Sequence, residues 1–237
     1  MTLRGPAGDL LPALTARLAE ITDRIERARA AAGAGPVELV GVSKHHPPAA
    51  IEAALSAGLC VFGENYAQEL ESKRAAITDL GARWHMIGPV QSNKAKRVVG
   101  CALIHTVDRP SLIAALDRHA TTAGLTQPVL VQVNVTAEPG KAGISPQSLP
   151  DLLDGFAACS AVVCVGLMLI PRLGSPTEIA DQFGALRGLR DEHSRVARPQ
   201  VALRELSMGM SEDFELAIAH GATIVRVGTA IFGTRPS

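Results

Sequence analysis

Aromatic side chains are scarce in this chain of 237 residues: Phe, Tyr and Trp together make up 3%, although hydrophobic residues make up 47%. A buried core must therefore consist mainly of Ala, Val, Leu and Ile, the residues that fill parallel sheets covered by helices on both faces. The length suits a single α/β barrel. We expect residues 1–237 to form one domain.

An excess of charge of either sign is also lacking, since 23 Lys and Arg residues balance 23 Asp and Glu residues. Without a net positive field, neither nucleic acid nor a membrane surface is an expected partner. No apolar run approaches the ~18 residues of a membrane-spanning helix. The first twenty residues contain acids and no continuous apolar stretch, so they do not predict a secretory signal.

Cysteine is limited to four residues, and none of them forms a Cys-x-x-Cys pair. All four lie in apolar stretches, which favours buried thiols over disulfides or a zinc site. Thiols of this kind are typical of a reducing compartment. We therefore expect a cytoplasmic protein.

The hydrophobic pattern predicts one long helix and then an alternation of strands and helices. Leu10, Leu14, Leu18, Ile21 and Ile25 predict an amphipathic helix over about residues 9–32. The expected strands are Val37–Val42, Cys60–Gly63, Arg83–Ile87, Leu103–Val107, Val129–Val135, Val162–Ile170, Arg204–Met208 and Thr223–Val227. The helical segments between them are Pro48–Ala57, Ala67–Ile77, Asn93–Val99, Ser111–Ala123, Ser148–Cys159, Pro176–Val196 and Glu212–His220.

Alternating strands and helices imply a parallel sheet, and eight such units favour a closed (β/α)8 barrel, a TIM barrel, with an extra N-terminal helix. The alternative is an open, doubly wound sheet. That fold would want a glycine-rich dinucleotide turn after its first strand, where this sequence has VGVSKHHPP. We therefore predict the barrel.

The active sites of such barrels lie at the carboxyl ends of the strands. Most of the predicted strand ends carry a side chain that ionises or forms hydrogen bonds. They are Ser43-Lys44, Glu64-Asn65, His85, His105-Thr106, Asn134, Met168, Ser207, and Arg226 with Gly228-Thr229.

Lys44 follows the first predicted strand. At an apolar rim a lysine is partly desolvated, which disfavours its charged form and lets the neutral amine attack an aldehyde. The alternative is a lysine that extends to solvent from a strand end. The adjacent His45 and His46 are compatible with metal binding, but neighbours on an extended segment point to opposite sides, so we expect no metal site.

The segment from Ser207 to Thr229 predicts an anion site, because phosphate-binding barrels commonly use the loops after strands seven and eight. Ser211 is predicted to cap the following helix. Gly228 lets backbone N–H groups approach an anion, and Arg226 shares its strand face. The alternative is a pair of ordinary glycine turns with a capping serine.

Two other polar segments lie close to predicted strand ends. Lys94, Lys96 and Arg97 gather in the first turns of a helix, where the macrodipole disfavours cations, and mark either an anion site or a solvated face. The segment Ala137–Ser145 holds two glycines, a proline and a charged pair, and predicts a mobile loop.

Nine sequence blocks occur in one order: VGVSK ending at Lys44, FGENYAQE (Phe62–Glu69), WHMIGPVQSNK (Trp84–Lys94), HTVDR (His105–Arg109), VQVNV (Val131–Val135), GKAGI (Gly140–Ile144), GLMLI (Gly166–Ile170), SMGMSEDFELAI (Ser207–Ile218) and VRVGTAIFG (Val225–Gly233). In these blocks, over about residues 37–233, the chain resembles the pyridoxal phosphate homeostasis proteins. The barrel of that family is similar to the N-terminal domain of alanine racemase.

This resemblance implies that the chain binds pyridoxal 5'-phosphate (PLP) as a Schiff base on Lys44. The other residues it implies are Ser207, Gly228 and Thr229 at the phosphate, with Met210 and Ser211 beside it, Arg226 at the pyridine nitrogen, Asn65 at the ring edge, and His85, Met168 and Asn134 as further wall. Where the family has a threonine or asparagine after the lysine, this chain has His45. A cofactor role for a second lysine beside Lys44 is therefore not expected.

The resemblance implies storage or delivery of PLP rather than turnover. PLP chemistry uses the protonated pyridine as an electron sink. Arg226 is always charged and cannot accept a proton, so opposite the ring nitrogen it favours the unprotonated pyridine and weakens that sink. A racemase also needs an acid and a base on opposite faces of the ring, and Tyr66 is the single tyrosine. An amino-acid racemase, or an aldolase using Lys44, is the alternative.

The expected partners are PLP itself and, transiently, apo forms of PLP-dependent enzymes. We expect a monomer or a weak homodimer. Lys141, between two glycines of the segment Ala137–Ser145, is a candidate gate for release of the cofactor.

Overall fold

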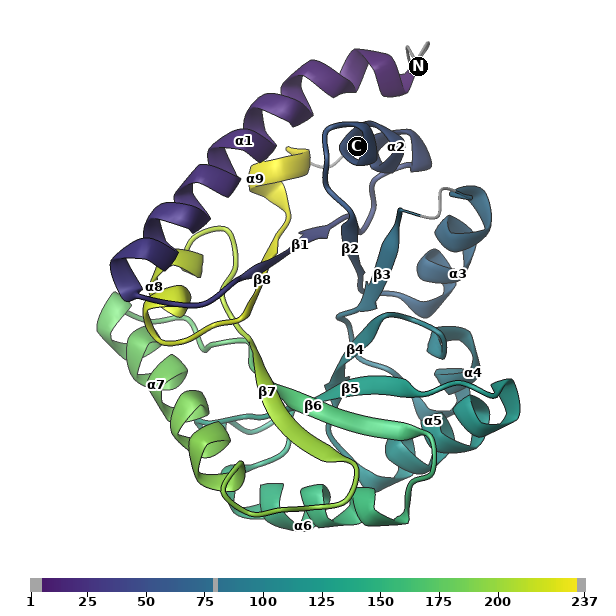
Figure 1. Cartoon of the computed structure of the whole chain (residues 1–237), viewed down its shortest axis with the longest axis vertical. Coiled ribbons are helices and arrows are strands. Elements are labelled where there is room, and N and C mark those ends of the chain that lie inside the picture. The colour runs from purple at the N-terminus through teal and green to yellow at the C-terminus, as the bar shows by residue number, and fades with distance from the viewer. Residues whose placement is uncertain (1–5, 79–80, 234–237) are drawn as a thin grey trace.

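The computed structural model describes residues 6–78 and 81–233 of the chain. Eight parallel strands close into a barrel in sequence order, and helices surround it (Figure 1). The strands are β1 (Glu38–Val42), β2 (Val61–Glu64), β3 (Arg83–Met86), β4 (Leu103–Val107), β5 (Gln127–Gln132), β6 (Val162–Met168), β7 (Val201–Ser207) and β8 (Ile224–Val227). The predicted (β/α)8 barrel is confirmed.

Helical segments connect the strands and cover the outside of the barrel. The α-helices are α1 (Pro6–Ala32), α2 (Pro48–Ser56), α3 (Ala67–Ala76), α4 (Ala95–Val98), α5 (Pro110–Ala123), α6 (Leu149–Asp154), α7 (Pro176–His193), α8 (Phe214–Ala219) and α9 (Thr229–Phe232). Three short 3-10 helices accompany them: η1 (Ser92–Lys94), η2 (Pro146–Ser148) and η3 (Gly155–Ala158).

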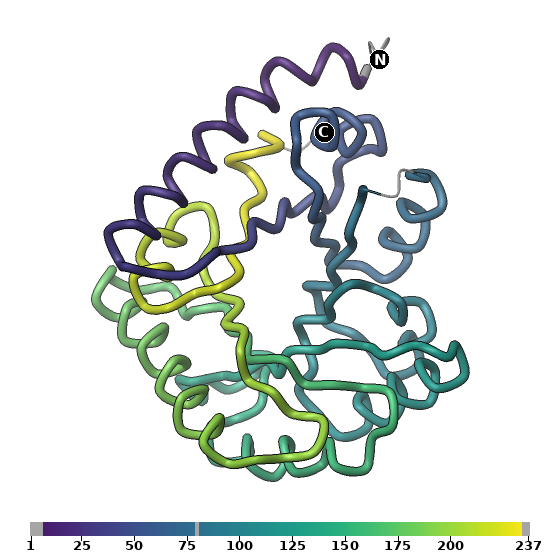
Figure 2. The backbone as a smooth tube through the Cα atoms, in the orientation of Figure 1, coloured from purple at the N-terminus to yellow at the C-terminus, as the bar shows by residue number. Residues whose placement is uncertain are grey.

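The predicted N-terminal helix is confirmed as α1, which begins at Pro6, three residues earlier than expected. Leu14, Leu18 and Ile21 are buried on its inner face, whereas Leu10 is 39% exposed, so its predicted place in the apolar stripe is wrong. Figure 2 shows the helix running along the outside of the barrel, where it contacts α2, α8 and α9. The helix therefore packs on the first and last units of its own barrel.

Two hydrophobic clusters lie on the two sides of the sheet. The inner cluster fills the barrel and consists of Val40, Val61, Leu103, Leu130, Met168 and Ile224. The larger cluster lies between barrel and helices and contains Phe62, which follows Val61 and so points to the opposite side. Both are dominated by aliphatic residues, as the scarcity of aromatics predicts.

The cysteines are all thiols, but they are not all buried. Cys101 and Cys164 lie in the core, Cys159 is half-buried, and Cys60 is exposed. The expectation of burial is wrong for Cys60 because it precedes β2 at the amino-terminal end of the barrel, where it lines a cavity. Within residues 6–78 and 81–233, no helix is long and apolar enough to span a membrane.

Candidate functional site

Lys44 lies just beyond the carboxyl end of β1 and is half-buried. The pairing of β1 with β2 and β8 puts Asn65 on one side of Lys44, and Gly228 and Thr229 on the other. Gly228 is close to β1, since a Cβ atom there would lie 3.3 Å from Cβ of Val42. The structure thus brings four of the predicted site residues together at three adjacent strand ends.

A buried lysine on α3 holds the backbone that precedes Lys44. Lys73 Nζ donates hydrogen bonds to the backbone oxygen of Ser43 at 2.7 Å, to Glu64 Oε1 at 2.8 Å and to Glu69 Oε1 at 2.7 Å. The side chains of Lys73 and Glu64 are 5% and 0% exposed. Burial raises the pKa of Glu64, an effect that the bonds from Lys73 and Ser43 oppose.

The backbone that follows Lys44 is held by the same network. His45 has φ +66°, a left-handed conformation that is uncommon for a residue with a Cβ atom. Its amide N–H donates to Glu69 Oε1 at 2.6 Å, and its ring packs on Tyr66 at 5.5 Å. The ring of His46 packs instead on α9. The two histidine rings therefore have different neighbours, and the turn around Lys44 is fixed on both sides.

Arg226 is buried at the carboxyl end of β8, with 4% of its surface exposed. Its Nη1 donates to Ser207 Oγ at 2.6 Å and its Nη2 donates to the backbone oxygen of Leu169 at 2.9 Å. Burial lowers the pKa of Arg226 to about 10, and the carboxylate of Asp213 opposes this shift. The guanidinium is therefore charged at neutral pH. Met168 pairs in register with Ser207, the residue that accepts the bond from Arg226.

Two histidines continue from Ser207 into the barrel. His105 Nδ1 lies 2.9 Å from Ser207 Oγ, and His105 Nε2 lies 3.0 Å from His85 Nδ1. His85 Nε2 lies 3.7 Å from Glu38 Oε2 at the start of β1. Burial lowers the pKa of His85 to about 3. Burial also lowers the pKa of His105 well below its ordinary value, and the repulsion that a protonated His85 and Arg226 would exert acts in the same direction. Both rings are neutral at physiological pH.

The turn between β7 and α8 carries Met210 and Ser211. Gly209 has φ +93°, and the amide N–H of Met210 donates to Asp213 Oδ1 at 2.6 Å. Asp213, not Ser211, is the N-cap residue of α8. The predicted cap on Ser211 is wrong because this turn delays the start of the helix to Phe214.

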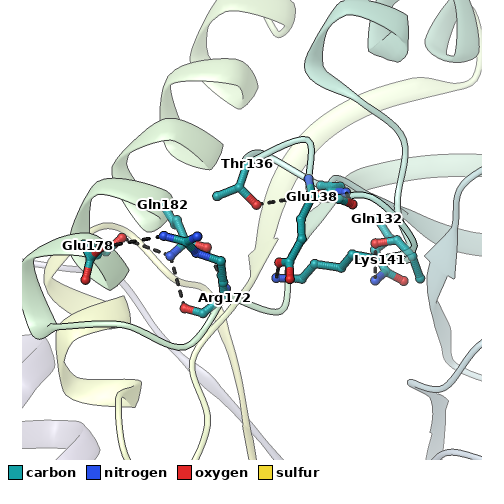
Figure 3. A network of polar contacts seen from close by, with 9 residues as sticks. Gln132, Thr136, Glu138, Lys141, Arg172, Glu178 and Gln182 are labelled. Atoms are coloured by element: carbon teal, nitrogen blue, oxygen red, sulfur yellow. Dashed lines mark hydrogen bonds and ion pairs between the residues drawn. The ribbon is translucent and has the colours of Figure 1, made fainter.

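The loop 137–145 returns to the end of β5. Gln132 Nε2 donates to a loop carbonyl at 3.2 Å, and the amide of Ile144 donates to the Gln132 backbone oxygen at 2.9 Å. Lys141 Nζ lies 3.6 Å from Glu138 Oε2 within the loop (Figure 3). The side chain of Asn134 donates to the Glu138 backbone oxygen at 2.9 Å, so its bonds go to this loop.

The basic cluster near Asn65 divides between two environments. Lys94, Arg109 and Asn65 line a cavity of about 350 Å³ beside the end of β2. Arg97 instead forms an ion pair with Glu71 at 2.8 Å on the surface. The sequence left open whether this cluster is an anion site or a solvated face. The cavity position of Lys94 is compatible with an anion site, whereas the surface ion pair of Arg97 favours a solvated face.

A larger cavity, of about 700 Å³, opens at the amino-terminal end of the barrel. It is lined by Glu38 and Arg83, the first residues of β1 and β3, by Glu205 within β7, and by His85. Arg83 pairs with Glu38 at 2.9 Å, and Glu205 Oε2 accepts a hydrogen bond from Thr223 at 2.6 Å. His85 therefore lies nearer this end than its predicted place in the site wall implies.

Sequence reasoning did not single out Lys73 or Glu38, and it named His105 only as a strand-end residue. One signal was present for the histidines: His85 and His105 each interrupt a strand that is otherwise largely apolar. Another was present for Lys73, which follows Glu69 by four residues on a helix, the spacing of a side-chain ion pair.

Comparisons with known proteins show relatives over nearly the whole chain. The family model of the alanine racemase N-terminal domain matches residues 16–236. The pyridoxal phosphate homeostasis protein of Aquifex aeolicus is 43% identical over 223 residues, which cover 92% of this chain and 97% of that protein. Two structures of PipY from Synechococcus elongatus are 40% identical and cover 93% of this chain and 100% of theirs. Their TM-scores are 0.84 without PLP and 0.79 with PLP bound.

Fold and family model together define a barrel of the alanine racemase N-terminal type, with a lysine at the end of its first strand. Within that class, the chain belongs to the family of pyridoxal phosphate homeostasis proteins.

Proposed function

We propose that this protein binds PLP at the carboxyl end of its barrel and stores or delivers it, holding it as a Schiff base on Lys44. The observation that carries the proposal is the position of Lys44 between Asn65 on one neighbouring strand end and Gly228 and Thr229 on the other. Schiff-base formation joins the Lys44 amine to the aldehyde carbon and releases water. The PLP-bound structure of PipY supports the choice of cofactor.

The residues at this end suit both reactive parts of PLP, an aldehyde and a phosphate. An aldehyde calls for an amine, and a phosphate calls for N–H and O–H donors. Gly228 leaves its backbone open where a side chain would crowd β1, and Thr229 is exposed beside it. We propose that these two residues bind the phosphate, with Met210 and Ser211 beside them.

Arg226 faces the pyridine nitrogen in this proposal. Two of its five N–H donors bond to Ser207 and Leu169. We propose that another of them faces the ligand. PLP supplies an electron sink when its pyridine is protonated. Since a guanidinium cannot accept a proton, Arg226 favours the unprotonated nitrogen and weakens that sink. The remaining proposed contacts are Asn65 at the ring edge and Met168 at the base of the site. His85, predicted as site wall, lies behind His105 toward the other end of the barrel.

We propose that PLP is held without turnover. Racemisation needs one proton donor and one acceptor on opposite faces of the cofactor ring. Lys44 can serve as one of them. The single tyrosine, Tyr66, is 54% exposed and packs on His45, outside the set of buried groups around Arg226. This arrangement supports binding without catalysis.

The same proposal includes partners and location. Residues 1–237 act as one unit, a monomer or weak homodimer, that passes PLP transiently to apo forms of PLP-dependent enzymes in the cytoplasm. The four thiols support a reducing compartment. Burial raises the pKa of Cys101 to about 11 and that of Cys164 to about 12, so these thiols remain protonated and unreactive.

Absorbance during titration with PLP tests the proposal. We expect a yellow protein that borohydride bleaches, and we expect Lys44→Ala to remain colourless. Lys96→Ala, which removes an exposed lysine from α4, is the matched control and should behave like the native protein. Equal colour in native protein and Lys44→Ala would contradict the assignment of Lys44.

An amino-acid assay separates storage from catalysis. Incubation of the PLP-loaded protein with L-alanine should leave the L form unchanged. Steady formation of D-alanine would replace the storage function by that of a racemase. Lys44-dependent cleavage of an aldol substrate by the PLP-free protein would indicate an aldolase.

A further inference from the structure

A chain of polar side chains crosses the inside of the barrel from its carboxyl end to its amino-terminal end. This interior chain consists of Arg226, Ser207, His105, His85 and Glu38. The successive distances between their polar atoms are 2.6, 2.9, 3.0 and 3.7 Å. The first three contacts are hydrogen bonds, and the last is an electrostatic contact longer than a hydrogen bond.

The interior chain runs through apolar surroundings. Arg226, Ser207, His105 and His85 are each at most 4% exposed, and the inner cluster of aliphatic residues lines the barrel around them. In such a low-dielectric interior each hydrogen bond is strong and a misdirected one is costly. The charged group near Arg226 is Asp213. The charged groups near Glu38 are Arg83, which pairs with its other oxygen, and Glu205, which lines the same cavity.

The two ends of the interior chain fix its direction. A guanidinium has no acceptor, so Ser207 Oγ accepts from Arg226 and can donate its own hydrogen to His105 Nδ1. His105 Nε2–H then donates to His85 Nδ1, and His85 carries its hydrogen on Nε2, facing the Glu38 carboxylate. In the reverse direction a lone pair of His85 Nε2 would face that carboxylate. The neutral state of both rings is consistent with a single direction.

We infer that Glu38, at the amino-terminal end of the barrel, is a positioning residue for the site at the carboxyl end. It fixes the hydrogen-bond direction of the interior chain and so turns the Ser207 hydroxyl hydrogen into the barrel. Ser207 therefore holds Arg226 instead of donating to the phosphate, a different role from the phosphate contact that the sequence resemblance implies. The effect on the cofactor rests on the proposed function, whereas the direction of the chain is a property of the protein alone.

Nitrogen-15 NMR of histidine-labelled full-length protein, without PLP, tests the direction. We expect His85 and His105 to carry their hydrogen on Nε2, with signals assigned from His85→Gln and His105→Gln. Glu38→Ala should mix the two tautomers in at least one ring. Glu205→Ala removes another carboxylate that lines the same cavity and should leave both rings unchanged.

A hydrogen on Nδ1 of His105 in the native protein overturns the inference. The same tautomer change in Glu38→Ala and Glu205→Ala overturns it as well, because the effect would then come from cavity charge in general. The native spectrum decides the direction of the chain even if Glu38→Ala does not fold.

Titration with PLP tests the effect on the cofactor site. In Glu38→Ala the His105 Nδ1–H competes with Arg226 for the Ser207 oxygen. We therefore expect the Kd for PLP to rise about two- to tenfold, the cost of one weakened hydrogen bond. Glu205→Ala should match the native Kd. An unchanged Kd in Glu38→Ala, with its tautomers mixed, overturns the positioning role.

Failure of the proposed function is recognised separately. If PLP leaves the absorbance of the native protein unchanged, the PLP-binding function fails and with it the effect on Kd. The histidine spectra still decide the direction of the interior chain.

Discussion

The ion pairs at the two ends of this barrel differ in burial. At the carboxyl end, Lys73 pairs with Glu64 at 2.8 Å, and the two side chains are 5% and 0% exposed. At the amino-terminal end, Arg83 pairs with Glu38 at 2.9 Å, and the side chains are 57% and 30% exposed. The buried pair also bonds to the backbone next to Lys44, whereas the exposed pair borders an open cavity.

This difference shows that the backbone geometry is held more firmly at the carboxyl end of the barrel. Burying an ion pair has a desolvation cost that is recovered only when its geometry is good and its remaining hydrogen bonds are made. Lys73 meets that condition with three acceptors, which hold the turn at the proposed Schiff-base lysine. Among the described residues, Glu64 Oε2 is buried without a hydrogen-bond partner, so the pair recovers only part of that cost. An exposed pair contributes little stability.

The largest expected effect comes from breaking the buried pair. Lys73→Met leaves Glu64 buried without its cation, and we expect a loss of about 3–5 kcal/mol in the free energy of unfolding. Arg83→Met is the matched change at the other end and should cost about 0–1 kcal/mol. Urea unfolding measures both. Similar losses in the two variants would remove the contrast between the ends.

Acid should destabilise the protein through its interior. Folding lowers the pKa of His85 to about 3 and also lowers that of His105, so the unfolded chain takes up protons that the folded chain excludes. Stability is then full above about pH 6.5 and falls as the pH decreases, by about 1.4 kcal/mol per pH unit for each histidine. Urea midpoints between pH 7 and 5.5 measure this slope. His85→Gln should reduce the slope of stability against pH. A flat profile in the native protein would show that the two histidine rings are not buried in the neutral form.

Gly88→Ala should disturb the carboxyl end alone. A Cβ atom there would collide with the backbone of Asn65, and such overpacking costs about 1–3 kcal/mol. We also expect weaker PLP binding, because the turn that carries Asn65 must shift. Gly35→Ala, in open space, is the control. Native affinity in Gly88→Ala would argue against a role for Asn65 at the ring edge.

The smallest effect is expected from Lys141→Ala. The ion pair to Glu138 spans 3.6 Å within a partly exposed loop, so its loss should change stability by less than about 0.5 kcal/mol. If Lys141 is a gate, its loss should instead change the rate at which PLP passes to an apo-enzyme. Recovery of that enzyme's activity over time measures this rate. An unchanged transfer rate would discard the gating role.

The fold was predictable because its signals are local. The strand at Leu103–Val107 was predicted to the residue, since Leu103, Ile104 and Val107 favour a buried strand and the charged Asp108 follows them. The errors in element boundaries arise where tertiary contacts determine where a strand or helix ends. β5 ends at Gln132 rather than Val135 because the chain pairs there with Ile144 from the returning loop, and α9 has only four residues, too few to show a period.

The candidate site was predictable only in part, for a similar reason. Lys44, Gly228 and Thr229 belong to strand ends that any closed barrel brings together. The link from His105 to Ser207 joins residues 102 positions apart, and no spacing in the sequence indicates it. The same holds for Lys73, whose bond to the Ser43 backbone depends on how α3 packs against the end of β1.

Mass mapping after borohydride reduction of the PLP-loaded protein tests the central proposal most directly. Reduction makes the link between cofactor and amine permanent, so that digestion and mass spectrometry locate it. The account predicts one stoichiometric adduct on the peptide that contains Lys44. An adduct on another lysine, or a folded protein with no adduct, would contradict it.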